Sequence, residues 1–217
     1  MKPTTRVACG LFRLILALLT VALCLGLRAE TASSPDKPND PVKDFALLDH
    51  QGAFRHLYYY AKDPATKAIV LFVQGNGCPL VRKRVPELIR LRDAYATNGV
   101  VFWMINANTQ DHRADVAKEA AEFGIDLPIL LDETQLAAKA LNITRTGEAM
   151  VIEPNRWRIR YRGAIDDRLS YETQKPEAQH EYLKEALDAL LAGKAVKTEV
   201  TSAPGCVVTY GKAAVAS

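Results

Sequence analysis

The chain has 217 residues, of which 48% are hydrophobic, a length and composition that suit one medium-sized domain with short additional segments. Its net charge of +3 depends on residues 1–29, which hold four basic residues and no acidic one. Without them the balance is 24 basic against 25 acidic residues, or −1, so the composition indicates neither nucleic-acid binding nor attachment to an anionic membrane.

The first segment has the pattern of a secretory signal peptide. Basic residues precede the almost wholly apolar stretch 11–27, and Ala29 offers a small residue for cleavage. The alternative is a retained membrane anchor, although this stretch is at the short limit for spanning a bilayer. Residues 30–42 are rich in Pro, Ser and Asp and predict a flexible leader. We therefore expect an exported protein, periplasmic or secreted, with no stable membrane insertion after cleavage.

Strand and helix patterns then alternate along residues 43–193, which we predict to form one domain. The apolar run 68–73 is typical of a strand that is buried on both faces. The order ββ, βαβαβα, ββα predicts an α/β domain whose central mixed sheet is covered by helices. In chain order, the predicted elements are strands 45–48, 54–60 and 68–73, helix 79–96, strand 100–105, helix 113–123, strand 127–131, helix 133–141, strands 149–152 and 158–162, and helix 177–191.

Signal cleavage would leave two of the four cysteines, Cys78 and Cys206, in a compartment where disulfides form. Two cysteines are too few for a disulfide scaffold but sufficient for one redox pair. Cys206 lies in the tail, residues 194–217, and we expect it to pair with Cys78. A free tail thiol, or a disulfide between subunits, is the alternative.

Cys78 occurs in the stretch QGNGCPLVRKRVP, between a predicted strand and a predicted helix. A helix N-terminus stabilises a thiolate, which is the reactive form of cysteine. Pro79 suits the first helical position, and Arg82 follows one turn later on the same helical face. The sequence therefore favours a nucleophilic Cys78, with an inert packed cysteine as the alternative.

A strand, a cysteine at the start of a helix and Pro86 eight residues later resemble the active-site segment of the thioredoxin superfamily. The resemblance covers about residues 43–193, and FGIDLPILLD and YRGAIDD are similar to segments of its redoxin and peroxiredoxin-like (AhpC/TSA) branch. It implies a thioredoxin-like three-layer α/β/α sandwich with an N-terminal strand pair. In that branch, a resolving cysteine outside the helix of the nucleophile is a known arrangement.

The chain departs from the family's patterns at four positions. Val81 replaces the second cysteine of the thioredoxin motif, and Leu71 and Gly75 stand where the peroxidases of the family have Pro and Thr. Gly147 takes the place of the family's cis-proline. Arg145 lies near the activating arginine of peroxiredoxins, but its offset favours an exposed loop residue.

These features favour a thiol–disulfide oxidoreductase that acts on a protein or small-molecule disulfide and uses a thiol reductant. A thiol-dependent peroxidase and a non-catalytic redoxin module that binds a partner remain alternatives. No nucleotide fingerprint or metal-ligand spacing occurs, so no cofactor or metal is expected. The expected catalytic residues are Cys78 and Cys206, and the expected substrate-binding residues are Asn76, Gly77, Pro79, Arg82, Thr146 and Gly147.

Overall fold

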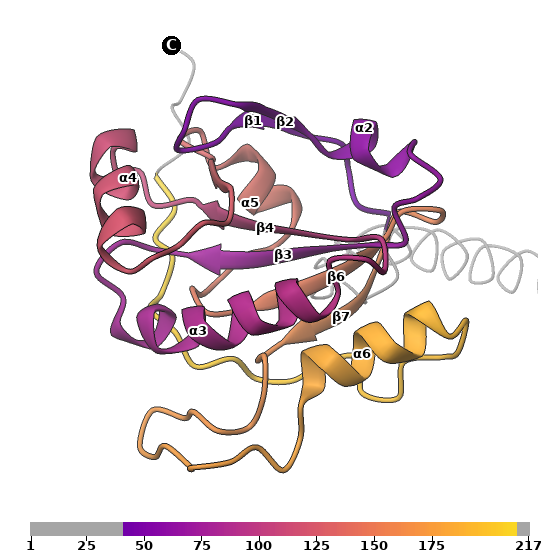
Figure 1. Cartoon of the computed structure of the whole chain (residues 1–217). Coiled ribbons are helices and arrows are strands. Elements are labelled where there is room, and N and C mark those ends of the chain that lie inside the picture. The colour runs from indigo at the N-terminus through magenta and orange to yellow at the C-terminus, as the bar shows by residue number, and fades with distance from the viewer. Residues whose placement is uncertain (1–40, 212–217) are drawn as a thin grey trace, which may run out of the picture. The chain divides into compact units, whose positions relative to one another are not determined.

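The computed structural model describes residues 41–211, which contain a five-stranded central sheet (Figure 1). The strand order is β5-β4-β3-β6-β7. β4 is parallel to β3 and to β5, whereas β6 is antiparallel to β3 and to β7. The predicted mixed sheet is therefore confirmed. The strands are β3 (Ala68–Gln74), β4 (Val100–Asn106), β5 (Ile129–Leu131), β6 (Ala149–Glu153) and β7 (Arg158–Gly163).

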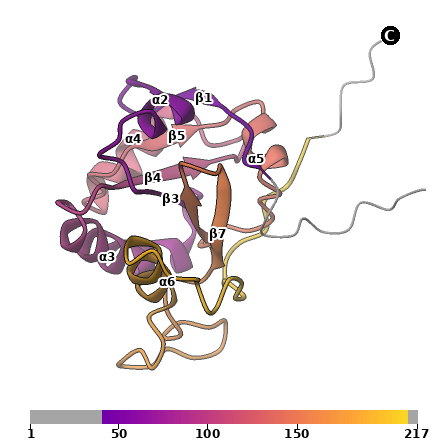
Figure 2. The ribbon, with the colours of Figure 1, turned by 90° about the vertical axis from the view of Figure 1, so that its right-hand side faces the viewer.

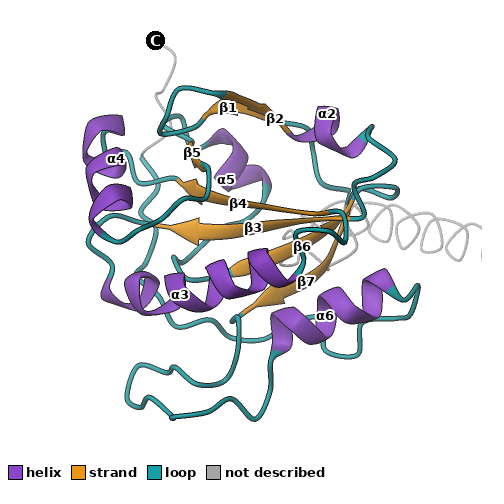
Figure 3. Ribbon diagram, viewed as in Figure 1, coloured by secondary structure: helices purple, strands orange, loops and turns teal. Residues whose placement is uncertain are grey.

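Helices cover both faces of this sheet, as Figures 2 and 3 show. α3 (Pro79–Ala94), α4 (Arg113–Glu122) and α6 (Tyr182–Leu191) contribute to one hydrophobic core, and α2 (Leu57–Ala61) and α5 (Leu136–Ala140) contribute to the other. Residues 68–73 of β3 alternate between these two cores, and all seven residues of the strand are buried. The three-layer α/β/α arrangement thus follows from strands that are apolar on both faces.

A separate two-stranded sheet pairs β1 (Ala46–Leu48) with β2 (Phe54–His56). The predicted N-terminal strand pair is present, but its second strand is shorter than the predicted 54–60. The chain leaves the ladder at Tyr58, whose N–H donates to the carboxylate of Asp44 instead of to a backbone carbonyl. The helix α2 then places Leu57 fully inside the second core.

The last two helices begin later than predicted because side chains hold the preceding segments in other conformations. Asp132 accepts the N–H groups of Leu136 and Ala138, which fixes the start of α5 at Leu136 rather than at 133. Similarly, Asp167 accepts the N–H groups of Gln179 and His180. Residues 177–181 therefore belong to an excursion, residues 164–181, between β7 and α6.

The tail packs onto the domain after α6. Val200 forms a parallel bridge with Arg162 of β7, and Val207 forms an antiparallel bridge with Arg145. Val208 is buried in the second core. In Figure 1 the yellow tail runs past the beginning of α3. The tail therefore contacts both the edge of the sheet and the segment that precedes β6.

The described chain already contacts the domain at its first residues, because Val42 is buried and its N–H donates to the carbonyl of Trp157 at 2.6 Å. The predicted signal peptide, residues 1–29, and nearly all of the predicted leader lie outside the described residues. Within residues 41–211, no helix combines the length and hydropathy needed to cross a bilayer.

Candidate functional site

Cys78 lies at the N-cap of α3, directly after the loop that follows β3. Its backbone N–H donates to the carbonyl of Gly75, and its carbonyl accepts the N–H of Arg82, the first bond of the helix. Pro79 occupies the first turn, where its missing N–H costs no hydrogen bond. Only 3% of the Cys78 surface is exposed, so the thiol is covered, although it lies at the mouth of the helix.

Two carboxylates hold the loop before Cys78. Asp111 accepts the N–H of Asn76 at 2.9 Å, and Glu119 accepts the N–H of Gly77 at 2.7 Å. These acceptors lie 35 and 42 positions further along the chain. Neither carboxylate is among the site residues predicted from the sequence, because an acidic residue in a loop, such as Asp111, or within a helix, such as Glu119, carries no pattern that assigns it to a distant turn.

Arg82 does not direct its charge at the sulfur alone. Its guanidinium forms an ion pair with Glu119 at 3.0 Å and lies over the ring of Phe123 at 4.2 Å from the centroid. Glu119 therefore neutralises part of the positive charge that Arg82 could offer to a thiolate at Cys78.

Cys206 reaches Cys78 from the tail, 128 positions away in the chain. The two sulfurs are 2.9 Å apart, and both residues are free thiols. Thr146 joins them: its Oγ1 accepts the N–H of Cys206 at 2.9 Å and lies 3.2 Å from the Sγ of Cys78. The N–H of Thr146 also donates to the carbonyl of Cys206. The tail is thus paired as a short strand with the segment before β6.

Two glycines allow this close pairing. Gly147 has φ +78°, and a Cβ there would lie 2.8 Å from the carbonyl oxygen of Pro204. A Cβ at Gly205 would lie 1.6 Å from the carbonyl oxygen of Thr146. The backbone that approaches Gly147 closely is therefore that of the chain's own tail. Among residues 41–211 every peptide bond is trans, including the one before Gly147.

The pKa values of the two thiols move in opposite directions. Burial raises the pKa of Cys78, but hydrogen bonds from Cys206, Thr146 and the N–H of Val81 outweigh it, so the pKa of Cys78 lies below that of an ordinary thiol. The hydrogen bond to Cys78, burial and the negative charge on Cys78 raise the pKa of Cys206. Near neutral pH, Cys78 is the better thiolate and Cys206 the proton donor.

No group of three His, Cys, Asp or Glu side chains in the described part of the chain could hold a metal ion. The groups that meet at the site are two sulfurs, one hydroxyl and the backbone that surrounds them. Such a set can form and break bonds between sulfur atoms without further groups.

Comparison with known proteins identifies the family of the chain. Residues 38–168 match the AhpC/TSA family, which is more than half of the chain. The chain belongs to the AhpC/TSA family. This AhpC/TSA protein is also 31% identical to an uncharacterized conserved protein from Geobacillus kaustophilus, with a TM-score of 0.70 over 81% of this chain and 93% of that one. No curated protein matches it.

Two further solved structures share the fold of this AhpC/TSA protein. A thiol:disulfide interchange protein of the thioredoxin family from Chlorobium tepidum TLS has 17% identity and a TM-score of 0.53, over 72% of this chain and 99% of that one. Peroxidoxin BcpB from Mycobacterium tuberculosis has 21% identity and a TM-score of 0.50, over 71% and 93%. The predicted thioredoxin-like redoxin fold is therefore confirmed. Most of the excursion, α6 and Cys206 lie beyond the segment that matches the family.

Proposed function

We propose that this protein is an exported thiol–disulfide oxidoreductase in which Cys78 is the nucleophile and Cys206 the resolving cysteine. One observation carries the proposal: the two sulfurs face each other at 2.9 Å. The opposite directions of their pKa values support it, because they assign one sulfur to attack and the other to hold the proton.

The reaction has two exchange steps. The thiolate of Cys78 attacks one sulfur of a substrate disulfide, whose S–S bond breaks, and the other sulfur leaves as a thiolate. Cys206 then loses its proton to a released thiolate or to water and attacks the Sγ of Cys78. This step forms the Cys78–Cys206 disulfide and expels the second substrate sulfur. The substrate gains two electrons, the protein loses two, and an external thiol reductant restores the pair.

The remaining residues would serve the first step. The hydroxyl of Thr146 stabilises the thiolate of Cys78, and the loop of Asn76 and Gly77 borders the sulfur. We propose that the substrate contacts this loop together with Pro79, Arg82 and Gly147. Because the tail covers Cys78, a bulky disulfide reaches the sulfur only when the tail moves away.

The burial of Cys78 favours a second candidate, a thiol peroxidase, because hydrogen peroxide is small enough to need little opening of the tail. In that reaction the Cys78 thiolate attacks one peroxide oxygen, the O–O bond breaks, the other oxygen leaves as hydroxide and takes a proton to become water, and Cys78 becomes a sulfenic acid. Cys206 then attacks this sulfur, which releases water and gives the same Cys78–Cys206 disulfide.

The test uses the full chain with Cys9→Ser and Cys24→Ser, so that Cys78 and Cys206 are the only thiols. The protein is treated with hydrogen peroxide or, separately, with a model disulfide, and its adducts are mapped by mass spectrometry. We expect a mixed disulfide on Cys78 that accumulates in the Cys206→Ser variant. The parent should convert it into an intramolecular disulfide within one monomer.

The other outcomes are separable. Rapid sulfenic acid formation with slow disulfide exchange would support the peroxidase, and no reaction with either oxidant would leave a non-catalytic module. A reducible dimer that depends on Cys206 would show that the resolving step occurs between chains. If Cys206→Ser and the parent had the same free-thiol count after oxidation, Cys206 would have no resolving role.

Export is a part of the proposal that rests on residues 1–29. We expect the exported protein to begin at Glu30, because Ala29 is the small residue that precedes the predicted cleavage site. N-terminal sequencing of the protein from the periplasmic or secreted fraction checks this. An intact chain beginning at Met1 in the cytosol would contradict it.

A further inference from the structure

Tyr171 makes contacts that are unusual for an exposed residue. Its side chain lies in the excursion and 61% of it is exposed, yet its hydroxyl is bonded to the tail. The phenol donates to the carbonyl of Gly205 at 2.8 Å and accepts the N–H of the same residue at 2.9 Å. Arg145 adds a hydrogen bond to the phenol at 3.1 Å.

This pattern is that of a strand with a partner on each edge. Successive residues of a strand direct their backbone groups to opposite edges. Cys206 exchanges its N–H and carbonyl with Thr146 on one edge, and Gly205 exchanges both groups with the phenol on the other. Tyr171 thus replaces a neighbouring strand at the residue directly before Cys206.

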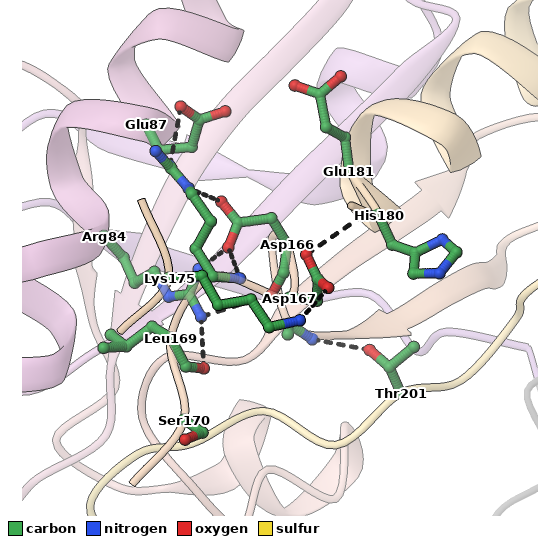
Figure 4. Close-up of polar contacts among 12 residues, drawn as sticks. Arg84, Glu87, Asp166, Asp167, Leu169, Ser170, Lys175, His180, Glu181 and Thr201 are labelled. Atoms are coloured by element: carbon green, nitrogen blue, oxygen red, sulfur yellow. Dashed lines mark hydrogen bonds and ion pairs between the residues drawn. The ribbon is translucent and has the colours of Figure 1, made fainter. Parts of the chain in front are cut away.

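The excursion that carries Tyr171 is anchored to the helix that presents Cys78. Arg84 of α3 forms a buried ion pair with Asp166 and donates to the carbonyl of Leu169 at 2.9 Å (Figure 4). Ser170 and Thr173 close the turn around Tyr171 through backbone and side-chain hydrogen bonds.

Asp167, which pairs with Lys175, closes the wider loop. The phenol is therefore held at a fixed position relative to α3, at whose first turn Cys78 lies.

We propose that Tyr171 is a positioning residue for the resolving step, which holds the Sγ of Cys206 against Cys78. The proposal rests on the proposed function. In the mixed disulfide, the Cys206 thiolate must approach the Sγ of Cys78 in line with the bond that breaks. Without the phenol, Gly205 keeps only the 3.4 Å hydrogen bond that Arg145 donates to its carbonyl. This edge of the strand is then held more weakly than the Thr146 edge, and the tail spends more time away from Cys78. Resolution then slows, and the Cys78–Cys206 disulfide becomes less favourable relative to external disulfides.

The experiment compares Tyr171→Phe with Tyr59→Phe in the full chain that carries Cys9→Ser and Cys24→Ser. Tyr59 is the matched control, because its side chain is 70% exposed and belongs to α2. The equilibrium constant of the Cys78–Cys206 disulfide is measured in glutathione buffers. The resolution rate is measured after mixing the reduced protein with a model disulfide.

For Tyr171→Phe we expect an equilibrium constant about tenfold smaller, as the loss of two ordinary hydrogen bonds implies. This is a change of ~30 mV in the two-electron potential. Resolution should slow by about the same factor, and Tyr59→Phe should match the parent in both measurements. A purely structural role would lower the melting temperature and leave the potential unchanged.

The possible failures are distinct. If the parent forms the intramolecular disulfide and Tyr171→Phe equals it in potential and rate, the positioning role is wrong and the proposed function stands. If the parent itself forms no such disulfide, the proposed function fails first, and the role of Tyr171 fails with it.

Arg145→Gln provides a second variant: it removes the hydrogen bonds to the phenol and to the carbonyl of Gly205 but keeps the phenol itself, so it should give a smaller change in the same direction.

Discussion

At the scale of single residues, the hydroxyl of Thr146 links the two halves of the site. Its oxygen accepts the N–H of Cys206, so its hydrogen is free to point at the sulfur of Cys78, 3.2 Å away. A hydrogen bond to a charged sulfur is worth more than one to a neutral thiol. This hydrogen bond therefore favours the thiolate, against the burial that opposes it.

We expect Thr146→Val to raise the pKa of Cys78, because burial then acts against fewer compensating hydrogen bonds. At pH 7 the alkylation of Cys78 should slow roughly tenfold, the loss that one charge-assisted hydrogen bond implies. The measurement is the rate of reaction with iodoacetamide as a function of pH. It is made in a Cys206→Ser background that lacks Cys9 and Cys24, so that a single thiol reacts.

Thr146→Ser is the matched control, since it keeps the hydroxyl and removes only a methyl group. Its pH profile should overlay that of the Thr146 parent. An unchanged profile for Thr146→Val would mean that the hydroxyl does not stabilise the thiolate. A slower rate at every pH, without a shifted midpoint, would point to altered access instead.

At the scale of elements, the helices and strands that depend on a local residue pattern could be predicted from the sequence. The strand before Cys78 and its helix were predicted to within two residues, because a continuous apolar run and a helical period are properties of adjacent residues. Two of the elements that were misjudged depend on side chains more than ten positions away. Asp44 ends β2, and Asp167 binds the backbone of the segment before α6, so that residues 177–181 do not join the helix.

The same distinction applies to the site. Cys78 could be found from its place at the helix start, and Thr146 and Gly147 from a family resemblance. Tyr171 could not, because an exposed tyrosine in a polar excursion has no sequence pattern that assigns it to a tail 34 positions away. The contact between Tyr171 and the tail depends on the buried ion pair of Arg84 and Asp166, which anchors the excursion to α3. Only the fold brings these two residues together.

At the scale of the whole molecule, oxidation should alter stability through two opposing terms. A disulfide between Cys78 and Cys206 would close a loop across most of the domain and constrain the unfolded chain, typically by about 2–4 kcal/mol. In the reduced protein, hydrogen bonds to the Cys78 thiolate stabilise the folded state relative to the unfolded state, and the oxidised protein lacks this term. We expect the loop to dominate, so the oxidised protein should unfold at a higher temperature than the reduced one.

This difference should depend on pH with a definite sign. Between the lowered pKa of folded Cys78 and the ordinary thiol pKa, the unfolded chain binds one proton more than the reduced fold, so the stability of the reduced fold rises with pH. Cys206 stays protonated in both states throughout this window, because its folded pKa is raised. The oxidised protein has neither titration. The free energy of unfolding of the oxidised protein should therefore exceed that of the reduced protein by a growing amount as the pH falls, by at most ~1.4 kcal/mol per pH unit.

Melting curves of the oxidised and reduced protein across this window check the sign, since nearly all other titrating groups are common to both forms. A limit of ~1.4 kcal/mol per pH unit corresponds to about 3–6 °C in the difference between the two melting temperatures. Reduced Cys78→Ser, which lacks the titrating thiol, should lose this rise of stability with pH relative to reduced parent. If the difference between the two melting temperatures stays constant or narrows as the pH falls, the fold does not favour the thiolate of Cys78. The electrostatic reason for making Cys78 the attacking sulfur would then be lost.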